Sequence, residues 1–119
     1  MSGTFEYINT DYLEEVSEGN NNLIYELIDL FIKQSSEFIS NFQTSLQEND
    51  LLLSKKTAHK AINALTIIGH KHIIKDLEII ENNETISFQS LEDIYNKFID
   101  INKQILKELE DYKKKIDNQ

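Results

Sequence analysis

The chain contains no proline and only three glycines, Gly3, Gly19 and Gly69, among its 119 residues. Proline and glycine mark most turns of β proteins, and both interrupt helices. Their scarcity makes long helices the expected structure. A chain of this length fits one domain, residues 1–119, whose single core can bury roughly two-thirds of the unfolded surface.

Apolar residues recur at helical spacing in five segments of the chain. The predicted helices are 10–18, 22–47, 50–68, 70–81 and 90–116. Four long amphipathic helices with short connections predict an all-α antiparallel up-and-down four-helix bundle. The short extra N-terminal helix is expected to pack across one end of this bundle.

Residues suited to capping stand near the predicted helix ends. The predicted N-caps are Thr10, Asn22, Asp50, and Ser90 in a capping-box variant with Asp93. Gly19 and Gly69 are expected to end helices 10–18 and 50–68, because glycine readily adopts the left-handed conformation found there.

Charge and composition exclude several classes of function. Twelve lysines and no arginine stand against 21 acidic residues, a formal net charge of -9. Phosphate backbones and anionic membranes repel such a surface, so neither nucleic acid nor a membrane is an expected partner. The first residues lack the regions of a secretory signal, and no apolar stretch approaches the ~20 residues of a membrane span. With no cysteine either, a cytoplasmic location is expected.

His59 is predicted to face solvent on helix 50–68, away from the apolar stripe of Ala58, Ala61, Leu65 and Ile68. A histidine in such a place is ordinarily a surface residue, and its spacing alone indicates no chemistry. His70 and His72 are two residues apart, which does not put them on one helix face, and no zinc or di-iron motif occurs. No metal site is therefore expected.

The segment AHKAINALTIIG, residues 58–69, resembles the signature of histidine-containing phosphotransfer (HPt) domains. In that family an Ala-His pair is followed by a core aliphatic residue, a lysine, a glycine, small residues and a glycine ten positions after the histidine. The resemblance covers roughly residues 7–81, including the polar Asn49-Asp50 junction. It implies a four-helix bundle with His59 exposed midway along one helix.

The resemblance also implies a phosphorelay intermediate, which carries a phosphoryl group on His59 and has no autonomous catalysis. Neutral imidazole is a nucleophile near neutral pH, and its N-phosphoryl product keeps a high transfer potential. The implied partners are a response-regulator receiver domain, a hybrid histidine kinase, or both. No cofactor of its own is expected, because Mg²⁺ lies on the receiver, and a monomer is expected.

Two positions depart from the family pattern. The family's lysine three residues after the histidine is Ile62 here, and its glycine four residues after is Asn63. That lysine would neutralise phosphoryl charge, and that glycine leaves room for a partner. Lys55, Lys56 and Lys60 are the candidates to supply the cationic charge instead.

Other residues share the helix face of His59. Leu52 and Ile62 flank it and are candidates for the apolar part of a docking surface, and Thr66 completes the set of neighbours. Two alternative functions stay open. One is a degenerate HPt-like scaffold or decoy, which binds a receiver or kinase without phosphotransfer. The other is an unrelated helical adaptor, in which His59 is incidental.

Overall fold

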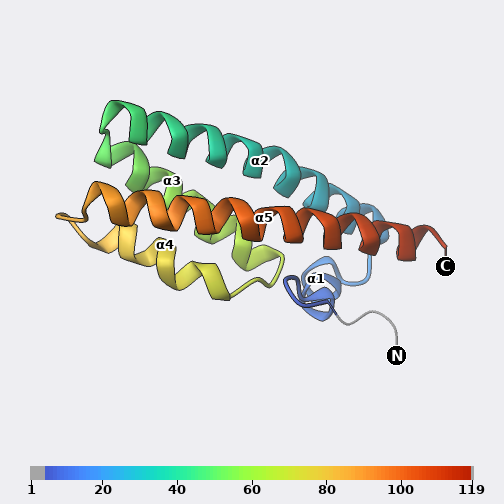
Figure 1. The fold of residues 1–119 in the computed structure, drawn as a ribbon. Coiled ribbons are helices and arrows are strands. Elements are labelled where there is room, and N and C mark those ends of the chain that lie inside the picture. The colour runs from blue at the N-terminus through green and yellow to red at the C-terminus, as the bar shows by residue number, and fades with distance from the viewer. Residues whose placement is uncertain (1–4, 119) are drawn as a thin grey trace.

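The computed structural model describes residues 5–118, which form five helices and no strand, as the all-α prediction requires. The helices are α1 (Thr10–Ser17), α2 (Asn21–Glu48), α3 (Leu51–Ile67), α4 (His72–Asn82) and α5 (Phe88–Asp117). Helix α2 packs against α3 and α5, α4 packs against the same two helices, and α1 contacts α2. Figure 1 shows α2 to α5 running along the length of the molecule, with α1 at the end where α5 finishes.

The first two helices begin at caps other than the predicted ones. Asn9 rather than Thr10 caps α1, and Asn20 rather than Asn22 caps α2. Each side-chain oxygen accepts a hydrogen bond from the backbone N–H three residues later, at 3.0 and 3.2 Å. Adjacent residues here are all competent caps, and the backbone is still extended at the residue that is used. The predicted cap of α3, Asp50, is confirmed.

Helix α5 also begins earlier than predicted. Ser87 is its N-cap, and the Ser87 hydroxyl oxygen accepts a hydrogen bond from the Ser90 backbone N–H at 3.1 Å. Ser90 therefore lies inside the first turn, and the predicted capping box of Ser90 with Asp93 is wrong. The reason is again competition between neighbouring serines that carry the same local capping signal.

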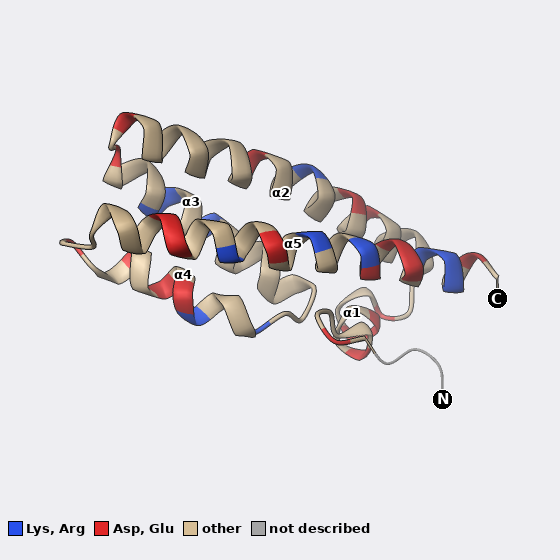
Figure 2. Cartoon of the chain, viewed as in Figure 1, with Lys and Arg blue, Asp and Glu red and all other residues tan. Residues whose placement is uncertain are grey.

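Charge is distributed unevenly among the helices. Helix α3 is the one helix in the described part of the chain that carries no aspartate or glutamate, although the whole chain has 21 acidic residues. Figure 2 shows acidic positions on the other helices and lysine positions on α3. The face of α3 is thus cationic on an otherwise acidic protein.

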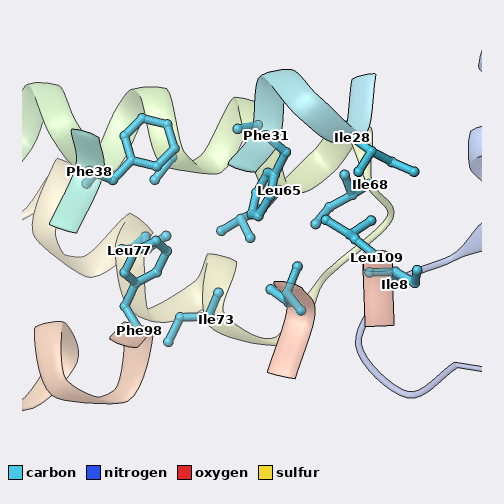
Figure 3. Close-up of a cluster of buried hydrophobic side chains, with 14 of the residues drawn as sticks. Ile8, Ile28, Phe31, Phe38, Leu65, Ile68, Ile73, Leu77, Phe98 and Leu109 are labelled. Carbon is cyan, nitrogen blue, oxygen red and sulfur yellow. The ribbon is translucent and has the colours of Figure 1, made fainter. Parts of the chain in front are cut away.

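The core lies between α2, α3, α4 and α5. Figure 3 shows Phe31 and Phe38 of α2 directed toward Leu65 of α3, Leu77 of α4 and Phe98 of α5. These side chains are at most 3% exposed. The predicted apolar stripe of α3, Ala58, Ala61, Leu65 and Ile68, is buried in this core. The opposite face of α3 is therefore exposed to solvent.

Residues 5–9 are held between α5 and the connection from α3 to α4. The Glu108 carboxylate accepts hydrogen bonds from three successive backbone N–H groups, those of residues 6–8, at 2.8–3.1 Å. On the other side, the Tyr7 carbonyl oxygen lies 2.9 Å from Nδ1 of His70. This segment ties α1 to one end of the molecule.

The imidazole of His70 is buried next to the start of α4, whose N-cap residue is Lys71. Nδ1 of His70 donates to the Tyr7 carbonyl, and its Nε2 accepts from the Ile73 backbone N–H at 3.2 Å. Only the neutral imidazole with hydrogen on Nδ1 satisfies both bonds. Helix α4 therefore begins at His72 rather than at residue 70. Burial lowers the pKa of His70 below its ordinary value, although the bond to Tyr7 opposes the shift.

Candidate functional site

His59 lies on α3, on the side away from the core. Its side chain is 63% exposed, while its neighbours Ala58 and Ala61 are fully buried. This contrast follows from the 100° step of a helix, which separates adjacent residues onto different faces. The predicted exposure of His59 is confirmed.

The imidazole of His59 is hydrogen-bonded to a carboxylate from the next helix. Nδ1 of His59 contacts Oε2 of Glu81, which lies in the last turn of α4. A carboxylate at neutral pH only accepts hydrogen bonds, so Nδ1 carries the hydrogen. In the neutral ring this leaves the lone pair on Nε2, for which the described residues provide no hydrogen-bond partner. His59 is therefore an exposed side chain whose ring is oriented by Glu81.

An open depression surrounds this pair. It is lined by His59, Glu81 and three lysines, Lys55, Lys56 and Lys60. Lys55 and Lys56 come from the turn of α3 that precedes His59, and Lys60 follows it directly. Within the described residues, none of the three lysines forms an ion pair with a carboxylate. The structure thus brings together the three lysines that the sequence predicted beside the histidine.

The other predicted site residues lie outside this depression. Leu52, Asn63 and Thr66 are exposed and share the face of His59 by their spacing along α3. The Thr66 hydroxyl donates to the Ile62 carbonyl oxygen at 2.8 Å, a bond within the helix. Ile62 is half-buried and packs against the core. Leu52, about two helical turns before His59, is 63% exposed.

Glu81 is the site residue that sequence reasoning missed, because its carboxylate resembled the other solvated acids of the chain. No residue type in the sequence marks it, and the packing of α3 against α4 explains the pairing. His59 and Glu81 each lie eleven residues from His70, in the connection between α3 and α4. Since α3 and α4 pack against each other through this short connection, residues equally far from it meet side by side.

Within residues 5–118, no three histidine, aspartate or glutamate side chains converge in a way that could hold a metal ion. None of the helices in the same range has the length and apolar character needed to cross a membrane. Comparison with protein-family models, curated proteins and solved structures found no match to this chain.

Proposed function

We propose that this protein is a phosphorelay intermediate of the HPt type, and that His59 is its phosphoryl acceptor. The observation that carries the proposal is the hydrogen bond from Nδ1 of His59 to Glu81, which leaves Nε2 as an exposed nucleophile on the surface of α3. The resemblance of residues 58–69 to the HPt signature supports the same residue.

The transfer uses the protein's nucleophile and the partner's electrophile. The lone pair of Nε2 attacks the phosphorus of an aspartyl phosphate on a receiver domain, and an N–P bond forms. The P–O bond to the aspartate breaks, and its electron pair leaves on the receiver's carboxylate. The reverse step returns the phosphoryl group to an aspartate. Mg²⁺ on the receiver stabilises the charge of the in-line transfer.

The finer architecture that we propose is an antiparallel up-and-down four-helix bundle of α2 to α5. The short connections and the packing of α2 and α4 against both α3 and α5 support it. Such a protein acts as a carrier without autonomous catalysis, and it supplies a nucleophile and a docking face. We propose a monomer in the cytoplasm, with a receiver domain or a hybrid histidine kinase as partner.

Intact-protein mass spectrometry tests this proposal, first with phosphoramidate as donor and then with a phosphorylated receiver domain. The wild type is expected to gain one acid-labile phosphoryl group. The His59→Ala variant is expected to keep its helical circular dichroism and to gain none. A labelled His59→Ala protein, or an unlabelled wild type in the presence of both the donor and a phosphorylated receiver, would overturn it.

A second candidate function is favoured by two residues beside His59. Ile62 is half-buried and uncharged, and Asn63 presents a larger side chain than the family's glycine at the exposed face. A protein changed in this way could bind a receiver domain without accepting phosphate and act as a scaffold or decoy. Tight receiver binding by a wild type that never becomes labelled would favour this function over the relay.

A further inference from the structure

His59 lies within the longest stretch of the chain that contains no aspartate or glutamate. Residues 51–75 contain no aspartate or glutamate and five lysines, whereas the other residues carry all 21 acids. Three of these five lysines line the depression beside His59. Such a segregation of charge, on a protein with a net charge of -9, indicates that the site receives an anion.

The residues that follow His59 offer no positive charge on its face. Ile62 packs against the core, and Asn63 is neutral. The cationic residues lie instead on the preceding turn, at Lys55 and Lys56, and beside the histidine at Lys60. Helical side chains lean toward the N-terminus, so the imidazole of His59 is inclined toward the turn of Lys55 and Lys56.

The charges in the depression match those of a phosphoryl group. Three lysines stand against the one carboxylate of Glu81, which leaves an excess of two positive charges while His59 is neutral. A protein-bound phosphoryl group brings about two negative charges near neutral pH. Glu81 by itself would repel that group, and the lysines offset this repulsion.

We infer that Lys55 and Lys56, assisted by Lys60, form the anion site that holds the phosphoryl group on Nε2 of His59. They are positioning residues, and their site lies on the turn before the histidine rather than on the turn after it. This inference rests on the function proposed above. With phosphoramidate as donor, Nε2 attacks the phosphorus, the N–P bond to His59 forms, and the donor's P–N bond breaks with its electron pair leaving on ammonia.

The test compares initial labelling rates with phosphoramidate at low ionic strength. The double variant Lys55→Gln/Lys56→Gln is expected to react about tenfold more slowly, since each unit charge roughly 6 Å from the phosphoryl group changes the rate about threefold in water-like dielectric. Lys71→Gln/Lys75→Gln is the matched control, because it removes the same charge from the same acid-free stretch outside the depression. It is expected to stay within about twofold of the wild type.

Two further measurements separate a charge effect from a structural one. Lys55→Arg/Lys56→Arg keeps the charge and is expected to label at a rate close to that of the wild type. Added NaCl should slow the wild type more than Lys55→Gln/Lys56→Gln, because screening acts on the charges that the variant lacks. Equal rates for Lys55→Gln/Lys56→Gln and the matched control would overturn the inference alone. A wild type that is labelled neither by the donor nor by a phosphorylated receiver would overturn the proposed function, and the inference with it.

Discussion

Nδ1 of His59 on α3 and the carboxylate of Glu81 on α4 are hydrogen-bonded across 22 residues of sequence. The imidazole of His59 is exposed to solvent, whereas the carboxylate of Glu81 is half-buried. A histidine held in this way has a defined ring orientation and a defined tautomer. The candidate site is therefore a property of two packed helices rather than of α3 alone.

Two variants of Glu81 are expected to show whether it affects the labelling rate by orienting the His59 ring or through its negative charge. Glu81→Ala removes the acceptor for Nδ1–H, so labelling of His59 by phosphoramidate should fall roughly 10–100-fold, by analogy with metal-ligating histidines that lose the hydrogen-bond partner that orients their ring. Glu81→Gln keeps an acceptor oxygen and removes the charge that repels the phosphoryl group, so its rate should be at least that of the wild type. Glu78→Ala, an exposed residue on the same helix, is the control. Equal rates for Glu81→Ala and Glu78→Ala would mean that the hydrogen bond does not contribute to the reaction.

Gly69 and Gly19 offer a matched pair for testing close packing. Both have positive φ, +78° and +73°, but a Cβ on Gly69 would lie 2.3 Å from Cβ of Asn9, while nothing lies within 4 Å at Gly19. Gly19→Ala should lower the free energy of unfolding by about 1 kcal/mol through strain alone. Gly69→Ala adds a clash and should cost about 3 kcal/mol. Urea denaturation at constant m value measures both. Similar losses in the free energy of unfolding for the two variants would show that the segment around Asn9 can move to make room for the new Cβ.

The Glu108 carboxylate is expected to hold residues 5–9 in place. Glu108→Ala leaves three backbone N–H groups without their acceptor, which should cost about 2 kcal/mol and speed amide hydrogen exchange at Tyr7 and Ile8. Glu110→Ala, on an exposed position of the same helix, should change stability by less than about 0.5 kcal/mol. Unchanged exchange at Tyr7 in Glu108→Ala would contradict the prediction.

His70 is expected to make the stability of the fold depend on pH. Burial lowers the pKa of His70 in the folded protein, whereas in the unfolded chain it titrates near 6.5. Between these two values the unfolded chain binds more protons, so the free energy of unfolding falls as the pH drops below about 6.5. The contribution of neutral His70 is fully present above that pH.

The corresponding measurement follows Tm between pH 7.5 and 5.5 for the wild type and for His70→Gln. The variant should be less stable at pH 7.5, because glutamine cannot reproduce both hydrogen bonds of the ring. Its Tm should also depend less on pH than that of the wild type, since the carboxylates titrate alike in both proteins. Parallel curves for the two proteins would assign the pH dependence to other groups.

Local signals in the sequence were sufficient to predict features that depend on a single helix. The scarcity of glycine and proline and the 3.6-residue spacing of apolar side chains predict an all-helical chain, the buried stripe of α3 and the exposed His59. The N-caps were less predictable, because neighbours such as Asn9 and Thr10 carry equivalent signals. Tertiary packing determines at which of the two residues the backbone changes from extended to helical, and therefore which residue is the N-cap.

Side-chain contacts between different helices could not be predicted from the periodicity of each helix. The periodicity of a helix determines which residues share its own face, and it contains no information about the register of the neighbouring helix. The pairing of His59 with Glu81, the approach of Gly69 to Asn9 and the hold of Glu108 on residues 6–8 all depend on that register. The sequence by itself thus determined the helices and the exposed histidine. Only the tertiary structure decided its partner, because packing and the short connection between α3 and α4 bring those two side chains together.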